Sequence, residues 1–584
     1  MAVVEARAGG RPRATSIASL LRPETPLFAI ALLAALFIVG LVVVVLYATV
    51  IDGLPGVEGK LSLVNYSDVM FSSVTYRALT NTIWLGLGTV AINFFFAVPI
   101  AWLIHRTSMP FKTVFLTLMY LGITIPGFLR AIAWILLLSP KIGLVNQFLR
   151  IFLPTDEGPL SIYNLPGIAF VQGLGLTAVM FFMISAAFLA VDPALEESAE
   201  VSGARKLSVM RRISLPLIAP ALAAAGIYNF MTAVSMFDTP ALLGAPSRIH
   251  VLSTLMFYTV HTDIGLPRYG VAGVYGVVLL VPTLIALYYY QKMLRRSYRY
   301  AVVTGKGYKP KLVELGPWKW AGVGFVSIFF FLELFLPLLV LIWTSLVPYI
   351  RLPSSEAFAS INAEGYRYAI DALLGRPLTN TLIMVLAVMF GVLFVSTIIS
   401  WVVLRTRMPG RYTLDSVAML PHAVPSIAFA FAIAFIALSL GKVLPLYGSL
   451  VVIILAHVVA YVSFGTRTIN GALIQIHRDL EEAVSTSGGS RITAIRKVIL
   501  PLLAPALFYS GLWVGLLSYR EVTMALFLQT PQNKVFSTVI WTLWGANKPS
   551  QAAALGVIMF VGTMIIVVIL LRTASQYVYG LRRR

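Results

Sequence analysis

Two stretches of this chain are near copies of each other. Residues 196–222 read EESAEVSGARKLSVMRRISLPLIAPAL, and residues 481–507 read EEAVSTSGGSRITAIRKVILPLLAPAL. Each stretch opens with a short charged segment, and long apolar runs lie before and after that segment. A charged loop that recurs between apolar runs predicts two related halves, each built of helices that cross a membrane.

The composition gives the class of protein. Hydrophobic residues make up 59% of the 584 residues and charged residues only 11%. A soluble protein of this length could not bury so much apolar side chain, which predicts a polytopic membrane protein. The formal net charge of +21 would suggest nucleic acid in a soluble protein. In a membrane protein, Lys and Arg collect in cytoplasmic loops beside anionic lipid, so we expect the lipid bilayer as a partner and no nucleic acid.

Twelve apolar segments are long enough to cross a bilayer as helices, which takes roughly 20 residues each. We expect them at residues 27–50, 82–105, 113–138, 167–190, 217–243 and 270–291, and at 318–346, 380–404, 413–439, 447–468, 501–529 and 552–572. The predicted fold class is an all-α polytopic membrane protein with two six-helix repeats. Its predicted units are an N-terminal arm (1–26), a first half (27–291), a basic linker (292–317), a second half (318–572) and a C-terminal tail (573–584).

The distribution of basic residues predicts the orientation. With both termini inside, about 30 of the 44 Lys and Arg residues fall in cytoplasmic segments and about 12 outside. This asymmetry follows the positive-inside rule. We therefore expect both termini and both charged loops in the cytoplasm.

The register of the repeat locates an insertion. LTNTIWLGLGTV (79–90) resembles LTNTLIMVLAVM (378–389), and RTSMP (106–110) resembles RTRMP (405–409). The two charged loops are separated by 14 fewer residues than the two members of each of these pairs. The first half should therefore carry a 14-residue insertion in an outer loop, around LPTDEGPLSIYNLPG (153–167). Because each half has an even number of spans, the halves should run in parallel about an axis along the membrane normal.

Each charged loop has the pattern of a helix, a glycine turn and a second helix. Gly203 can adopt the turn conformation that other residues resist. Leu207 and Met210 are three residues apart and should share one face of the second helix, as should Ile492 and Ile495. Such a helix could rest on lipid. Its repetition at the same place in both halves favours docking onto a partner with two matching sockets.

These residues resemble the inner-membrane permeases of binding-protein-dependent ABC importers. The signature of that family is Glu-Ala-Ala, three residues, Gly, nine residues and Ile-x-Leu-Pro. The first loop has Glu197-Ser198-Ala199, Gly203 and Ile213-Ser214-Leu215-Pro216, and the second has Glu482-Ala483-Val484, Gly488 and Val498-Ile499-Leu500-Pro501. The resemblance implies the type I importer permease fold, with coupling loops at 192–216 and 477–501. It assigns ATPase coupling to Glu197, Ser198, Ala199, Gly203, Leu207, Met210 and Pro216, and to Glu482, Ala483, Gly488, Ile492, Ile495 and Pro501.

The resemblance also implies partners and a location. A homodimer of ABC ATPase subunits would dock on the two loops, and a periplasmic substrate-binding protein would deliver the substrate. ATP and Mg would be held by the ATPase, with no cofactor on this chain, in a bacterial inner membrane. The segments FDTPALLG (237–244) and YREVTMALFL (519–528) look like those of the ferric-iron uptake branch. Ferric iron is therefore the expected substrate; thiamine, polyamine, phosphonate or sugar-phosphate import is the alternative.

Other classes of function fit less well. A phosphate-binding loop needs Gly, four residues, then Gly-Lys-Ser/Thr, and none of the Gly-Lys pairs at 59–60, 305–306 and 441–442 meets that pattern. We therefore expect a transport subunit and no enzyme. A proton-coupled secondary transporter is the alternative of another class. However, the loops HRTSMPFK and LRTRMPGR lack the Gly and Asp that are usual in the major facilitator type.

Ionisable residues inside spans are costly, so they are candidates for the substrate path. Those expected on the path are Arg130, Asp238, His422, Arg520 and Glu521, and Glu333 also falls within a span. Asp238 and Glu521 lie near the outer ends of the equivalent fifth helices. Pro126 and Pro425 occupy matching mid-span positions, where a kink could open a cavity. The competing interpretation is that these charges pair with one another as structural bridges.

Overall fold

The computed structural model describes residues 25–57, 59–153, 155–190, 198–199, 201–204, 206–262, 265–297 and 312–582. Within these residues the protein is almost entirely helical, and a small hairpin joins strands β1 (Ile51–Asp52) and β2 (Lys60–Leu61). In the described part of the chain, ten helices are long and apolar enough to cross a membrane, or up to twelve if each of two bent pairs is one span. This confirms the predicted fold class.

The elements follow the chain in two series. The first contains α1 (Thr25–Thr49), α2 (Val64–Met70), α3 (Ser73–Arg106), α4 (Lys112–Gly122), α5 (Gly127–Leu138), α6 (Leu144–Leu149), α7 (Leu165–Ala190), α9 (Lys206–Val209), η2 (Met210–Ser214), α10 (Leu215–Ser235), α11 (Asp238–Gly244), η3 (Ala245–Ser247), α12 (Leu252–Val260) and α13 (Tyr269–Ser297).

The second series contains η5 (Gly316–Trp318), α14 (Lys319–Phe330), η6 (Phe331–Phe335), α15 (Leu336–Leu346), α16 (Ser355–Ala359), α17 (Glu364–Leu373), α18 (Arg376–Arg405), α19 (Arg411–Ala418), α20 (Leu420–Ala423), α21 (Ser426–Ser439), α22 (Leu450–Gln475), α23 (Asp479–Thr486), α24 (Arg491–Ala494), η7 (Ile495–Ile499), α25 (Leu500–Arg520), α26 (Thr523–Leu528), α27 (Phe536–Gly545) and α28 (Pro549–Arg582).

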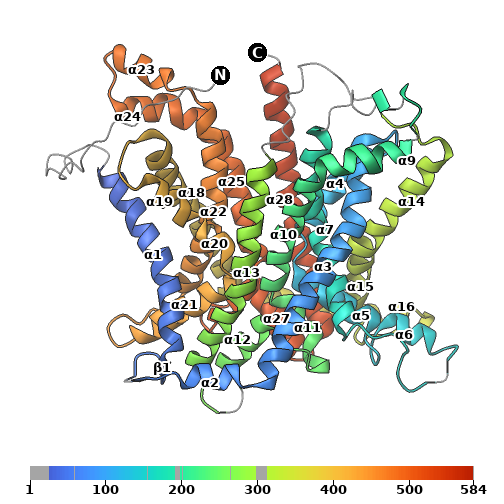
Figure 1. Cartoon of the computed structure of the whole chain (residues 1–584). Coiled ribbons are helices and arrows are strands. Elements are labelled where there is room, and N and C mark those ends of the chain that lie inside the picture. Colours follow the sequence, from blue (N-terminus) through green and yellow to red (C-terminus); the bar gives the residue numbers. More distant parts are fainter. Residues whose placement is uncertain are drawn as a thin grey trace.

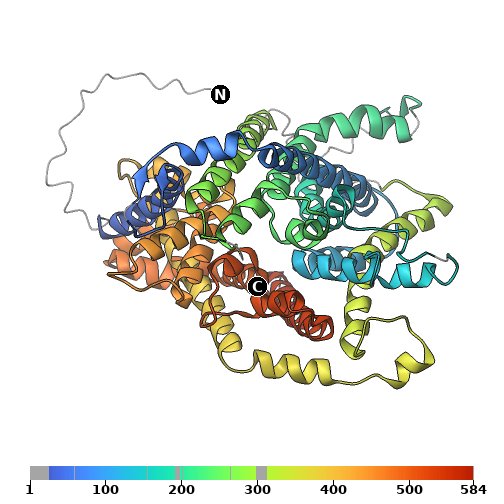
Figure 2. The same cartoon turned by 90° about the horizontal axis from the view of Figure 1, so that it is seen from below.

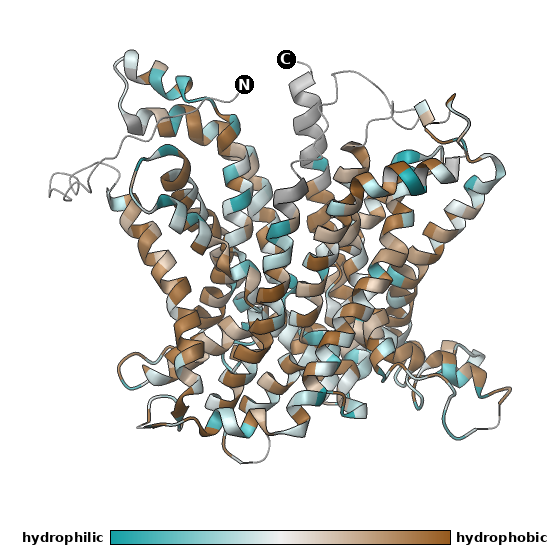
Figure 3. Ribbon diagram, in the orientation of Figure 1, coloured by the Kyte–Doolittle hydropathy of each residue, from teal (hydrophilic) through white to brown (hydrophobic). Residues whose placement is uncertain are grey.

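The two ends of the helix bundle differ in what they carry. Figure 1 shows α9, α23 and α24 at one end, which we call the coupling face, and β1, α2, α6 and α16 at the opposite end. Apolar residues cover most of the long helices, while hydrophilic residues are frequent in α23 (Figure 3). The charged loops therefore lie beyond the end of the apolar bundle, as a loop outside a bilayer must.

The first span of each half packs against the other half. Helix α1 contacts α18, α19 and α21 of the second half in addition to α13 of its own half. The stretch from α14 to α15 likewise contacts α3 and α5 of the first half in addition to α28 (Figure 2). Aromatic pairs join this second interface, with ring centroids of Phe115 and Phe330 at 5.9 Å and of Phe96 and Phe329 at 5.2 Å. The two sequence repeats thus form one interlocked bundle.

The third and ninth predicted spans are each broken into two helices. Helices α4 and α5 meet at 99°, and the α19–α20 segment meets α21 at 102°. The break falls at Pro126 and at Pro425, which both adopt extended backbone angles and precede the next helix. Proline lacks an amide donor and disfavours helix in the residue before it, so a helix ends there. The kinks expected at both prolines are confirmed, and each bend is sharp enough to divide the predicted span, 113–138 or 413–439, into two helices.

The predicted fifth and eleventh spans run too far. Helix α10 ends at Ser235 and α25 ends at Arg520, and each is followed by a separate short helix, α11 or α26. The apolar run continues through both short helices because they are buried inside the bundle. An apolar run cannot distinguish one long helix from two buried short ones. The insertion, in contrast, lies where expected: 26 residues (139–164) separate α5 from α7, but only 10 (440–449) separate α21 from α22.

Candidate functional site

The two coupling loops contain the same glycine turn. Gly203 has φ of +87° and Gly488 has φ of +78°, in the left-handed region that favours glycine. The amide after each glycine donates to the carbonyl five residues earlier: Ala204 to Ala199 at 3.0 Å and Gly489 to Val484 at 2.9 Å. This hydrogen bond is typical of the Schellman motif that ends a helix. The expected glycine turn is therefore present in both halves; it is followed by α9 in the first half and lies between α23 and α24 in the second, while most of the first loop's opening segment lies outside the described residues.

Each loop then joins its membrane helix through a π-helical turn. The turns are η2 and η7, and the Leu-Pro pairs of the signature, at Pro216 and Pro501, follow them directly. A proline within a helix has no amide donor and clashes with the carbonyl four residues earlier. A wider turn before the proline relieves that conflict, and such turns recur at functional sites. Figure 1 shows that α24 runs across the direction of α25, so the loop turns sideways at the coupling face.

The structure describes most of the predicted coupling residues. Glu197 lies outside the described residues, as do the side chains of Leu207, Met210 and Ile492. Ala199 and Ile495 are half-buried. The others are exposed on the loops and at the start of the following helices: Ser198, Gly203, Pro216, Glu482, Ala483, Gly488 and Pro501. Their role in ATPase coupling stays a prediction.

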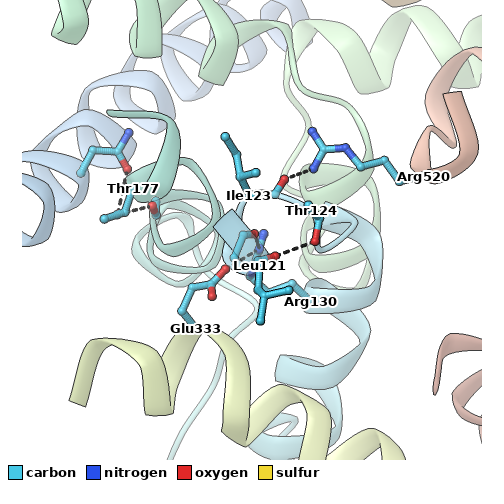
Figure 4. A network of polar contacts seen from close by, with 10 residues as sticks. Leu121, Ile123, Thr124, Arg130, Thr177, Glu333 and Arg520 are labelled. Atoms are coloured by element: carbon cyan, nitrogen blue, oxygen red, sulfur yellow. Dashed lines mark hydrogen bonds and ion pairs between the residues drawn. The ribbon is translucent and has the colours of Figure 1, made fainter. Parts of the chain in front are cut away.

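A buried ion pair joins the two halves. Arg130 on α5 places Nη2 2.7 Å from Oε1 of Glu333, and the two side chains are 4% and 1% exposed. Glu333 lies in η6, the π-helical turn in the first span of the second half. Figure 4 shows the pair beside the break between α4 and α5. Removing one partner of a buried ion pair strongly destabilises the folded protein, because the other charge stays buried without a partner.

The broken third span receives arginine contacts from both halves. Arg130 donates to the carbonyl of Gly122 at 3.5 Å, and Arg520 on α25 donates to the carbonyl of Ile123. Thr124 donates to the carbonyl of Leu121 at 2.6 Å (Figure 4). These carbonyls stand at the end of α4, where a helix leaves its last acceptors without internal partners. Charged donors satisfy them inside the protein.

Glu521 holds the start of α26. Its carboxylate accepts the amides of Met524 at 2.8 Å and 3.0 Å and of Ala525 at 3.3 Å. On its other side, Nε2 of His457 lies 3.3 Å from the carboxylate. Nδ1 of His457 lies 2.8 Å from the carbonyl of Ile453, so both ring nitrogens face oxygen atoms. The sequence analysis did not single out His457. The feature that could have identified it is a single histidine within a long apolar run.

Four of the five expected path residues lie near the break between α4 and α5: Arg130, Asp238, Arg520 and Glu521. Asp238 is 8% exposed at the start of α11 and lies so close to α5 that a Cβ on Gly127 would sit 2.5 Å from its Oδ2. Arg130, Arg520 and Glu521 lie within electrostatic range of Asp238. His422 belongs to a different place, in α20, where its exposed ring stacks on Tyr228 of α10 at 5.1 Å.

An aromatic cluster that the sequence did not reveal joins the halves toward the face opposite the coupling loops. The ring of Phe237 lies 4.7 Å from Phe257 of its own half and 5.9 Å from Trp541 of the second half. Phe527 of the second half lies 5.9 Å from Phe257 and 4.9 Å from His261. Helices α11, α12 and α27 all lie in the lower part of Figure 1. We call these five residues the aromatic cluster.

A helical bundle of two parallel repeats, with one coupling loop per repeat at the same end, defines a transport permease of the membrane. A sequence profile of the family described as "Binding-protein-dependent transport system inner membrane component" matches residues 96–300 and 395–583, more than half of the chain. The chain belongs to this family. It is a multi-pass inner-membrane protein and a non-catalytic transport subunit, and the resemblance drawn from the two loops is confirmed.

Relatives include two ferric permeases. The chain is 24% identical over 518 residues to the "Ferric transport system permease protein FbpB" of Actinobacillus pleuropneumoniae, covering 84% of this chain and 70% of that one. It is 25% identical over 499 residues to the "Putative ferric transport system permease protein FbpB 1" of Haemophilus influenzae, covering 80% and 72%. The "Putative 2-aminoethylphosphonate transport system permease protein PhnV" of Salmonella typhimurium is 29% identical over 256 residues, covering 43% of this chain and 92% of PhnV.

Among solved structures, the chain is similar to one in the crystal structure of a bacterial alginate ABC transporter in complex with an alginate pentasaccharide-bound periplasmic protein. The identity is 23% and the TM-score 0.34, and the match covers 41% of this chain and 85% of that one.

Proposed function

We propose that this chain forms the whole transmembrane channel of an ATP-driven importer. Two copies of an ATPase subunit dock on the two coupling loops, and a periplasmic binding protein delivers substrate to the opposite face. The observation that carries this proposal is the recurrence of one turn geometry, at Gly203 and Gly488, on one face of the molecule. A homodimeric ATPase presents two identical sockets, which two alike loops would fit.

The coupling face lies in the cytoplasm in this proposal, together with both termini. Arg211, Arg212, Arg496 and Lys497 are exposed within the coupling loops, where the positive-inside rule expects basic residues. ATP and Mg are held by the ATPase subunits. The proposed path for the substrate passes Arg130, Asp238, His422, Arg520 and Glu521.

Ferric iron is the proposed substrate. It is supported by the two ferric permeases, whose similarity extends over both halves of this chain. The second candidate is 2-aminoethylphosphonate, supported by the similarity of PhnV to 43% of this chain and by the guanidinium groups of Arg130 and Arg520, which could bind an anion. Proteoliposomes that contain the permease, its ATPase and its binding protein separate the two. ATP-dependent uptake of radioactive iron supports the first candidate, and uptake of labelled 2-aminoethylphosphonate in its place supports the second.

The proposed cycle moves the two halves against each other. ATP binding closes the ATPase dimer and draws the loops together, which opens the opposite face to the binding protein; hydrolysis restores the starting state. The contacts that must part in this step include those between Phe237 and Trp541 and between Phe257 and Phe527, since each joins one half to the other.

A further inference from the structure

The repeated motifs RTSMP and RTRMP end the second span of each half, and the proposed importer function assigns them no role. In the second half, the hydroxyl of Thr406 donates to the carbonyl of Val402 at 2.7 Å and accepts the amide of Met408 at 3.3 Å. Thr107 and Met109 repeat both contacts in the first half. The threonine therefore ends the helix and turns the chain, which leaves the arginine at a fixed position on the last helical turn.

From the end of α18, Arg405 contacts two other elements. Its Nη2 donates to the carbonyls of Leu473 at 3.0 Å and Ile476 at 2.6 Å, at the end of α22. Its Nε lies 3.1 Å from Oε1 of Glu481 on α23, with side-chain exposures of 6% for Arg405 and 26% for Glu481. A planar guanidinium can hold several acceptors at once, whereas lysine offers a single point charge. Arg405 thus links α18, α22 and the second coupling loop.

A second contact runs in the opposite direction. Arg478, just before α23, donates through Nη2 to the carbonyl of Leu404, the neighbour of Arg405 on α18. The coupling loop is therefore attached to the end of α18 by two side chains, one from each partner. Helix α18 in turn packs on α22, on α25 and on α1 of the first half. A movement of α23 reaches the interior of both halves through this helix.

We propose that Arg405 and Glu481 are positioning residues that couple the second loop to the membrane helices. Their ion pair passes the displacement of the loop to α18 when the ATPase closes. This inference rests on the proposed function. It separates two tasks of Arg405: the bonds to Leu473 and Ile476 hold the fold together, while the pair with Glu481 carries the coupling. Arg106 stands at the matching position of the first half, and the residue that matches Glu481 is Glu196, outside the described residues.

Two substitutions separate those tasks. Glu481→Gln removes the charge of the ion pair and leaves both carbonyl bonds of Arg405 in place. Arg405→Lys keeps a positive charge near Glu481 but cannot reproduce the planar fork to the two carbonyls. The control is Arg407→Gln, because Arg407 is exposed in the same motif. All three variants are assembled with the ATPase and the binding protein in proteoliposomes.

For Glu481→Gln we expect an unchanged melting temperature and normal copurification of the ATPase. Stimulation of ATP hydrolysis by the binding protein should fall by about fivefold to tenfold, the lower part of the usual range for coupling between sites. For Arg405→Lys we expect the reverse, a lower melting temperature with most of the stimulation retained. Arg407→Gln should match the unmodified protein in both measurements.

The inference is overturned if Glu481→Gln keeps the stimulation of Arg407→Gln, or if it loses the ATPase from the complex, which would make Glu481 a residue that docks the ATPase. Failure of the proposed function looks different. In that case the unmodified permease neither retains the ATPase nor shows stimulated hydrolysis, whatever residue stands at position 481.

Discussion

Arg520, at the end of α25 in the second half, donates a hydrogen bond to the backbone carbonyl of Ile123, at the break between α4 and α5 in the first half. The long side chain of Arg520 carries a charged guanidinium from the second half to this carbonyl of the first half, at the end of α4, where a helix leaves its last acceptors without internal partners. The proline break therefore creates an acceptor that the second half uses, and the two halves are joined at the point where a span is interrupted.

Replacing Arg520 by Gln should remove this link. The carbonyl of Ile123 would lose a charged donor, and such hydrogen bonds contribute about 1.5–3 kcal/mol. We expect a corresponding drop in the free energy of unfolding in detergent, together with impaired uptake. Arg467→Gln is the control, because the side chain of Arg467 is 53% exposed. Equal stability of the two variants would contradict a structural contribution of Arg520.

The ion pair of Arg130 and Glu333 predicts a non-additive mutant cycle. Arg130→Met alone leaves Glu333 buried without its partner and should cost about 3–5 kcal/mol. Glu333→Leu alone should be costly for the same reason, because it leaves Arg130 buried without its partner. The double variant Arg130→Met with Glu333→Leu should be far less destabilised than the sum of the single effects, because both charges are gone. Additive losses in thermal or denaturant unfolding would show that the two residues act independently.

Cysteine labelling tests the orientation. The chain has no native cysteine, so single substitutions need no altered background. Thr486→Cys, exposed at the end of α23, should react with a membrane-impermeant maleimide only in inverted vesicles. Ser355→Cys, exposed at the start of α16 on the opposite face, should react in spheroplasts. Labelling of position 486 in spheroplasts would place the coupling loops outside and remove the basis for ATPase docking.

The aromatic cluster offers a test of the proposed cycle. Cysteines at Phe237 and Trp541 join the two halves, and we expect them to crosslink without nucleotide and much less when ATP and vanadate trap the complex. Cysteines at Phe237 and Phe257 are the matched control. The control pair shares position 237 with the test pair, but both of its residues lie within the first half, so its crosslinking should not respond to nucleotide. An unchanged yield for the pair between the halves would mean that this contact does not part during the cycle.

The local parts of this architecture were predictable and the parts that depend on packing were not. The turns at Gly203 and Gly488 and the kinks at Pro126 and Pro425 could be predicted, because glycine and proline act through backbone geometry within a few residues. The hydropathy pattern predicted one span where the structure has α10 and α11, because a buried short helix is as apolar as a membrane span. The exchange of α1 between halves leaves no mark in a single sequence. His457 and Glu521 are 64 residues apart, and only the fold brings them together.

The glycine turns of the coupling loops carry the most direct prediction about coupling. A Cβ at Gly203 or Gly488 would meet no atom within 4 Å, so the strain of a substitution comes from the backbone alone. A β-branched residue resists positive φ, and the left-handed conformation costs about 1–2 kcal/mol per residue even for ordinary side chains. Gly203→Val and Gly488→Val should therefore distort the end of the first loop helix and redirect the second.

We expect each valine variant to copurify less ATPase and to lose stimulation by the binding protein, with the double variant inactive in uptake. The control is Gly471→Ala on α22, which also has open space around the added Cβ but has no positive φ. It should behave as the unmodified protein, since helix interiors accept alanine well. Because the turn lies outside the apolar bundle, the melting temperature of the permease should change little in all variants. Full ATP-driven uptake by the double valine variant would mean that the loops are not the docking elements, even though their geometry repeats.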